Sequence, residues 1–241
     1  MTERPLQWDS SYATARDAVH LVAVHVLARR RFSFSGRFGL RPAPGGLGTP
    51  MFGHEEVLRI SGTNLIREHQ SEQGSTSTTM PLPGASLADV AHFADVDLSE
   101  PFSVGRDTPP IEDADRPLSI TERAAETMAD WYALGARALD RVVVRLGADG
   151  DAAVIQLWPE HFDVATDVAV GDTRANVGAS PGDRVSEAPY LYVGPHTPAR
   201  PGDPEYWNVP FGALVSHDQI HSAADADAFF ARGLALLAGE A

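Results

Sequence analysis

The sequence predicts an α+β fold: a mostly antiparallel sheet with an N-terminal helix, a long central helix and a C-terminal helix. Short apolar segments with a two-residue period follow one another, with turn residues between them, as in antiparallel hairpins. Strands and helices do not alternate regularly, and no glycine-rich phosphate loop follows a strand. Both observations disfavour a Rossmann fold.

The first 41 residues predict a helix and then a strand. Ser10 and Ser11 are candidate N-caps for a helix whose apolar residues recur at helical spacing. His20 and His25 lie five residues apart on it, about 140° around the axis, so they do not form a two-ligand face. They are expected to be packed or capping histidines. The period changes to two over Phe32–Leu40, which indicates a strand.

The stretch up to residue 117 predicts short elements and a long connection. These elements are a hairpin over 56–60 and 64–69, a solvated loop or edge strand over 70–79, and a helix over 86–94 capped by Ser86. Residues 95–117 are acidic and proline-rich. We expect one α+β domain over 1–241. In it the connection either joins lobes 1–94 and 118–241 or wraps around them as ordered chain.

The rest of the chain predicts the central helix and the strongest strands. A capping box at Ser119 to Glu122 opens the helix, and Gly147 can end it. The predicted elements that follow are strands over 154–158, 161–170, 174–180, 188–193 and 211–215, then a helix capped by Ser222. Pro159 separates the first two strands, because proline cannot donate to a strand ladder.

The composition excludes several chemistries. The chain has no cysteine, which excludes thiol catalysis, iron–sulfur clusters and cysteine-bound zinc. It also has no lysine, which excludes anchoring of pyridoxal phosphate as a Schiff base and a P-loop. A formal charge of −14 makes general nucleic-acid binding unfavourable. The polar N-terminus and the lack of a long apolar run predict a cytoplasmic protein with no membrane partner.

Three segments resemble an uncharacterised bacterial family that carries a W-P-x-H-F-D-like motif, here Trp158 to Asp163. The other two are Ser180-Pro181-Gly182-Asp183 and Pro189-Tyr190-Leu191-Tyr192-Val193. The N-terminal Trp8 and Ala18-Val19-His20-Leu21 also resemble the family's opening helix. A Gly-Lys pair that often follows that helix in the family is missing here. The resemblance implies one integrated domain and no particular activity.

The first candidate site is Glu160, His161, Asp163 and Asp167. Strand alternation would place His161, Asp163 and Asp167 on one face. A histidine between carboxylates suits a general base or a hard-metal site, so Glu160, His161 and Asp163 are candidate catalytic residues. The alternative is that this face is the solvent side of an amphipathic strand.

Two further groups complete the candidates. His217 and His221 would be i, i+4 ligands on a helix, and with His161 and Asp163 they form the candidate metal set. If Ser222 caps the last helix, both histidines instead lie in a turn before it. The candidate ligand-binding residues are Trp158, His196, Tyr206 and Trp207, because the proline-rich loop from residue 194 could border a pocket.

We therefore expect a protein that binds a small molecule beside the Trp158–Asp163 strand, under the loop from His196 to Trp207. The alternatives are a metal-dependent hydrolase or isomerase that uses His and Asp ligands, and a protein-interaction module with an exposed apolar patch. A divalent metal is the one cofactor that the residues suggest. The oligomeric state is not predicted.

Overall fold

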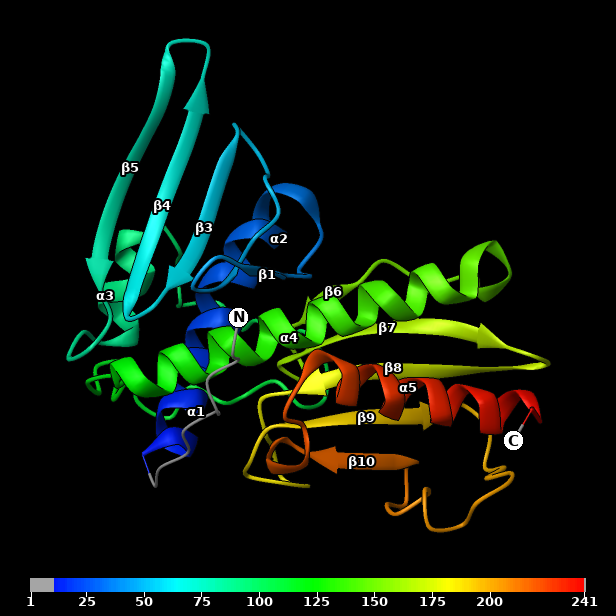
Figure 1. Ribbon diagram of the computed structural model, residues 1–241. Coiled ribbons are helices and arrows are strands. Elements are labelled where there is room, and N and C mark those ends of the chain that lie inside the picture. Colours follow the sequence, from blue (N-terminus) through cyan, green and yellow to red (C-terminus); the bar gives the residue numbers. More distant parts are fainter. Residues whose placement is uncertain (1–10, 241) are drawn as a thin grey trace. The chain divides into compact units, whose positions relative to one another are not determined.

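The computed structural model describes residues 11–240 and confirms an α+β fold with two five-stranded antiparallel sheets (Figure 1). The described residues form two compact units. The first unit comprises 11–130 and 157–162, and the second comprises 131–156 and 163–240. The proline-rich connection lies within the first unit.

The first unit opens with one continuous helical stretch. Its segments are α1 (Tyr12–Val22), the π-helical η1 (Ala23–Ala28) and α2 (Arg29–Ser35). The strand predicted over Phe32–Leu40 is wrong, because the helix runs on to Gly36, which ends it with a left-handed φ of 66°. Phe32 and Phe34 are both about half exposed, so their alternation does not mark a buried strand face. Ser11 makes no side-chain cap, and Ser10 lies outside the described residues.

The first sheet is an antiparallel meander in the order β1-β2-β3-β4-β5. Its strands are β1 (Arg41–Ala43), β2 (Gly46–Gly48), β3 (Glu56–Ser61), β4 (Asn64–Ser71) and β5 (Gly74–Pro81). The predicted hairpin is confirmed as β3 and β4, and the segment 70–79 belongs to the end of β4 and the edge strand β5. Helix α3 (Leu87–Phe93) begins at Ser86 with the predicted capping box to Asp89.

The central helix is α4 (Glu122–Leu146), which begins in the first unit and continues in the second. Thr121, rather than Ser119, accepts a hydrogen bond from a first-turn amide, that of Ala124, at 3.3 Å. A short helix η2 (Gly147–Gly150) follows.

The second sheet has the order β10-β9-β8-β7-β6. Its strands are β6 (Gln156–Trp158), β7 (Asp163–Val170), β8 (Thr173–Ser180), β9 (Tyr190–Pro195) and β10 (Ala213–Ser216). After η3 (His217–Gln219), helix α5 (Ala223–Ala238) begins at the predicted cap, Ser222.

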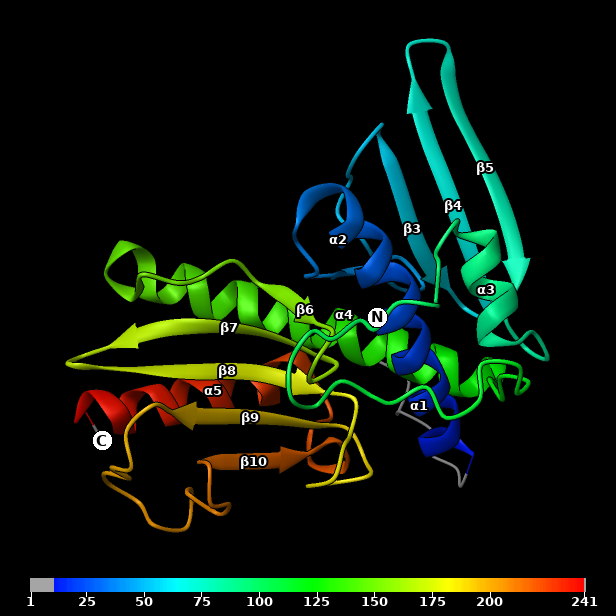
Figure 2. The ribbon, with the colours of Figure 1, turned by 180° about the vertical axis from the view of Figure 1, so that it is seen from behind.

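Within residues 11–240, helices cover one face of the second sheet and leave the other without a helix (Figure 2). The alternate residues Val164, Val168 and Val170 of β7 are buried on that face, and α5 packs against β7 and β9. Gly135 of α4 lies directly over Ala179, since a Cβ at Gly135 would be 2.5 Å from the Ala179 Cβ. Figure 2 shows the opposite face with no helix over it. The predicted strand 161–170 begins two residues late, at Asp163, so His161 is not a strand residue.

The contact between Gly135 and Ala179 gives a test of the second unit's packing. Alanine at position 135 gains about 1 kcal/mol of helix propensity but overpacks the core, which costs about 1–3 kcal/mol. We expect Gly135→Ala to lower the free energy of unfolding by about 1 kcal/mol, measured by urea unfolding. Adding Ala179→Gly should recover part of that loss. A double variant that loses the full sum of both single effects would contradict this packing.

Candidate functional site

The segment Trp158 to Asp163 is a tight turn between two strands. The Phe162 amide donates a 2.7 Å hydrogen bond to the Trp158 carbonyl oxygen, and Phe162 adopts a left-handed φ of 58°. This conformation is uncommon for a bulky residue, so the surroundings must hold it. Phe162 is buried, and its ring stacks on that of His20 with a 4.6 Å centroid distance. The turn leaves Glu160 half-buried and the side chain of His161 56% exposed.

Two histidines of the N-terminal helix fix the chain on both sides of the site. The Nε2 of His20 lies 2.7 Å from the carbonyl oxygen of Pro159, and the Nε2 of His25 lies 2.7 Å from that of Pro109. A carbonyl oxygen can only accept, so each ring donates from Nε2. Both histidines are packed, as predicted, and each holds a segment that carries an acidic residue of the site.

Burial keeps these two rings neutral. Desolvation lowers the pKa of His20 to about 4, against the opposing effect of its hydrogen bond to Pro159. Desolvation also lowers the pKa of His25. At neutral pH both rings are therefore uncharged hydrogen-bond donors.

The loop that carries Asp107 is held by its own side chains. The Thr108 hydroxyl donates to the Gly105 carbonyl oxygen at 2.7 Å and accepts from the Val104 amide at 3.0 Å. The carboxylate of Glu160 packs directly on Gly105 and accepts from the Asp107 amide at 3.3 Å. A Cβ at Gly105 would overlap this carboxylate, so glycine is needed there.

Asp107, Glu160 and His161 form a cluster that could hold a metal ion. One ligand atom from each lies within 4.8 Å of the others. Nδ1 of His161 is 3.7 Å from Asp107 Oδ2, and Nε2 is 4.0 Å from Glu160 Oε2. Carboxylate and imidazole ligands together suit ions such as Mn²⁺ and Zn²⁺. Within residues 11–240, no other group of three acidic or histidine residues meets this condition.

The predicted partner Asp163 belongs to a different network, in the second unit. Its Oδ2 accepts a hydrogen bond from the Tyr192 hydroxyl, and the residue is 4% exposed. Beside it, the Tyr190 hydroxyl donates to Asp183 Oδ2 at 2.7 Å. Each of the three segments that resemble the family therefore contributes to these hydrogen bonds, through Asp163, through Asp183, and through Tyr190 and Tyr192. The segment Trp158 to Asp163 also contributes Glu160 and His161 to the cluster with Asp107.

Both tyrosine hydroxyl groups of this network donate to carboxylates. Burial, more than their carboxylate partners, raises the pKa of both Tyr190 and Tyr192 well above the usual value. A phenol with a raised pKa is a poor general base at neutral pH. The network is suited to fixing β9 and the turn at Asp183 on the sheet.

The other candidate residues make structural contacts. His196 pairs with Asp167 at 2.8 Å, and Arg174 bridges Asp167 to Asp151 on the uncovered sheet face. Pairs that are partly open to solvent, as these are, contribute little stability. The Tyr206 hydroxyl donates to the Phe229 carbonyl oxygen at 2.9 Å, and the Trp207 indole donates to that of Pro201 at 2.8 Å. The polar atom of each ring therefore has a partner within the second unit.

His217 and His221 do not share a helix face. His217 lies in η3, and the His221 amide donates to Asp225 Oδ2 at 2.9 Å, just before α5. This is the turn that follows if Ser222 is the cap. Neither histidine belongs to the metal-compatible group found among the described residues.

Trp158, another candidate ligand-binding residue, is the last residue of β6 and is 37% exposed.

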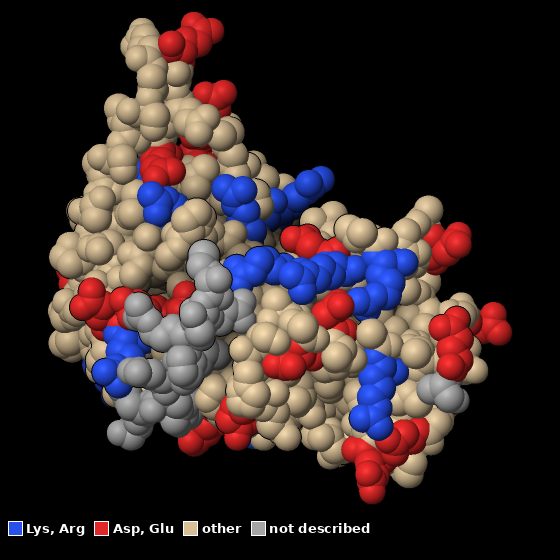
Figure 3. Space-filling model, viewed as in Figure 1, with Lys and Arg blue, Asp and Glu red and all other residues tan. Residues whose placement is uncertain are grey.

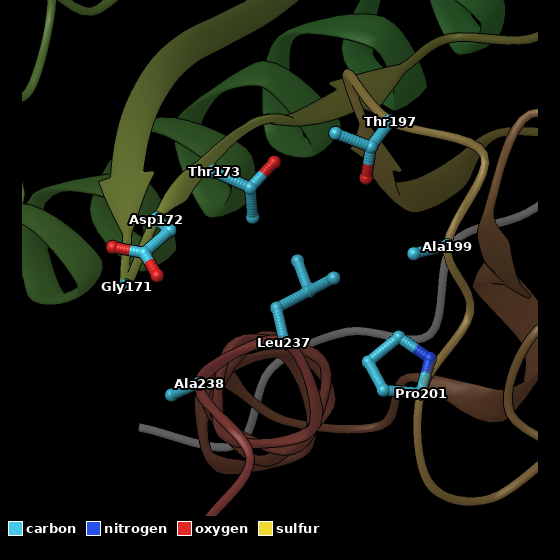
Figure 4. Close-up of a pocket in the computed structure, with 8 residues that line it drawn as sticks. All are labelled: Gly171, Asp172, Thr173, Thr197, Ala199, Pro201, Leu237 and Ala238. Atoms are coloured by element: carbon cyan, nitrogen blue, oxygen red, sulfur yellow. The ribbon is translucent and has the colours of Figure 1, made fainter.

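One surface hollow of about 320 Å³ lies in the second unit (Figure 4). It is lined by Gly171, Asp172, Thr173, Thr197, Ala199, Pro201, Leu237 and Ala238. The figure shows Leu237 of α5 pointing toward the space between Thr173 and Pro201. The predicted loop thus borders a hollow, but at the Gly171 end of β7 and not beside Asp163.

Sequence reasoning missed Asp107, His20 and His25 as parts of the site. Asp107 is one of several acidic residues in the connection, and no spacing distinguishes it. The two histidines offered a signal, since they are polar residues within an otherwise apolar helix segment. Their partners lie 139 and 84 residues away, which no local pattern reveals.

Comparison of the chain with protein families, curated proteins and solved structures finds no match. The family resemblance therefore stays a prediction. Over residues 11–240, none of the helices is both long and apolar enough to cross a membrane.

The neutral state of His20 predicts how stability depends on pH. The unfolded ring titrates near 6.5 and the folded ring near 4, so the unfolded chain binds more protons between these values. The contribution of His20 to the free energy of unfolding is therefore fully present above about pH 6.5. It is lost as the pH falls toward 4, and the loss is at most about 3 kcal/mol. We expect His20→Gln to flatten this pH dependence in urea unfolding between pH 7.5 and 4.5.

The exposed His221 provides the control, because His221→Gln should keep the wild-type slope. A His20→Gln variant with the same pH dependence as the wild type would show that the ring is not held neutral by burial.

Proposed function

We propose that the protein binds a divalent metal ion through Asp107, Glu160 and His161. The observation that supports this is the approach of two carboxylates and one imidazole to within 4.8 Å of one another. The carboxylates come from segments 53 residues apart, and each segment is fixed by a helix histidine through a backbone carbonyl. Such outer contacts keep ligands in place before the ion arrives.

Three protein ligands would leave coordination positions for water, as catalytic sites do and structural sites do not. A bound divalent ion supplies Lewis acidity and a water of lowered pKa. The reaction class that we propose is therefore metal-assisted hydrolysis. The exposure of the His161 side chain leaves the cluster open to a substrate.

Titration calorimetry with Mn²⁺ and, separately, Zn²⁺ tests the metal site. We expect one equivalent to bind the wild-type protein, and His161→Ala and Asp107→Asn each to weaken binding more than about tenfold, because the first removes a ligand and the second removes the negative charge of one. His221→Ala, a histidine outside the cluster, should bind as the wild type does. Absence of binding, or equal binding by all variants, would contradict the proposal.

Gly105 tests whether the loop positions Glu160. We expect Gly105→Ala to weaken metal binding about 10- to 100-fold although all three ligands remain, because the new methyl group displaces the Glu160 carboxylate. Gly74→Ala is the matched control: Gly74 also has a positive φ, 125°, but no atom lies within 4 Å of its Cβ position. Equal metal binding by the two variants would show that the contact with Gly105 does not position the ligand.

A second candidate function is small-molecule binding in the hollow beside Leu237, which the loop 197–201 borders. Its lining combines hydroxyl groups of Thr173 and Thr197 with apolar side chains, which offers hydrogen bonds and apolar contacts to one ligand. Fragment screening by amide chemical shifts should give changes that gather at Thr173, Thr197 and Leu237. Shift changes scattered over the surface would argue against this site.

A further inference from the structure

Strand β5 ends the first sheet, and within residues 11–240 no strand pairs with its outer edge. Two backbone hydrogen bonds show which residues of β5 direct their amide and carbonyl groups toward β4 and which direct them outward. The Leu82 amide donates to the Thr63 carbonyl oxygen, so the even-numbered residues of β5 face β4. The Gln70 amide donates to the Glu55 carbonyl oxygen, on the side of β4 away from β5. Even-numbered residues of β4 therefore face away from β5, which agrees with this assignment. The amides of Ser75, Ser77 and Thr79 therefore point outward.

This edge lacks the usual protection against pairing. Native edge strands carry charges, bulges or prolines within the strand. The segment Gly74–Pro81 reads GSTSTTMP, which has no charged residue and a proline only at its end. The register of β4 and β5 continues without a bulge over eight residue pairs. Figure 3 shows the hairpin as mostly uncharged surface with acidic side chains near its tip.

We propose that β5 pairs with β5 of a second copy of this chain, antiparallel and about a two-fold axis at Ser77. This register places Ser75 opposite the second copy's Thr79 and joins all three outward amides of each strand. It gives about six backbone hydrogen bonds, and each of the three outward residues both donates and accepts. Serine and threonine side chains pair favourably across strands.

Side-chain exposure favours a second copy over a foreign peptide. The chain carries a formal charge of −14, so two copies repel each other generally, but the uncharged β5 lets their edges approach. A foreign strand is selected through pockets for alternate side chains. Residues 74–79 are exposed on both faces, so no such pockets flank the strand. Self-pairing needs only matched backbone groups.

The predicted dimer is weak. One strand pair buries less than the roughly 1,200–2,000 Å² of a typical stable interface, so we expect a dissociation constant above about 1 μM. Sedimentation velocity of the full chain from about 10 μM to 1 mM should show reversible dimerisation. Ser77→Pro should abolish it, because proline removes the central outward amide while leaving the pairing with β4. Ser77→Ala keeps that amide and should dimerise as the wild type does.

A charge exchange tests the register. In the two-fold arrangement, Ser75→Lys with Thr79→Lys places like charges opposite each other and should weaken dimerisation about 2- to 30-fold. Ser75→Glu with Thr79→Lys places opposite charges there and should dimerise at least as tightly as the wild type. Thermal unfolding of each variant checks that the fold is retained.

A monomer at all concentrations, including one whose edge captures only foreign strands, would overturn the proposal. So would a dimer that Ser77→Pro leaves intact.

Discussion

Two partly buried hydrogen bonds, from His20 to Pro159 and from His25 to Pro109, hold the segments that carry Glu160 and Asp107 in the first unit. Each connects the N-terminal helix to a segment that ends in an acidic side chain of the cluster. A neutral ring is essential, since burying an imidazolium without a partner charge is costly. Desolvation and hydrogen bonding thus act together: burial keeps the rings neutral, and the backbone carbonyls occupy their donors.

The same acidic side-chain type has two different roles in this protein. Asp163 is buried and accepts from Tyr192, so its contacts favour a fixed, structural carboxylate. Asp107 and Glu160 are only half-buried and lie beside an exposed imidazole. Depth of burial and the type of neighbour, and not the residue type, separate the network that stabilises the second unit from the cluster that could hold an ion.

Local signals predicted most of the fold. Capping residues placed the starts of α3 and α5, and alternation placed β3, β4 and β8, because these patterns depend on neighbours within a few residues. Prediction failed where a long-range contact decides the conformation. The left-handed Phe162 is held by the His20 ring, and it turns His161 out of the strand in which alternation placed it. Asp107 joins Glu160 across 53 residues, which no spacing rule anticipates.

The central claim is that Asp107, Glu160 and His161 act as one ligand set. A crystal soaked in Zn²⁺ and measured at the zinc absorption edge tests it most directly. We predict one anomalous peak that is about 2.0–2.2 Å from an oxygen of each carboxylate and from an imidazole nitrogen of His161. A peak bound by only one of these residues, or zinc bound only elsewhere on the protein, would contradict the account.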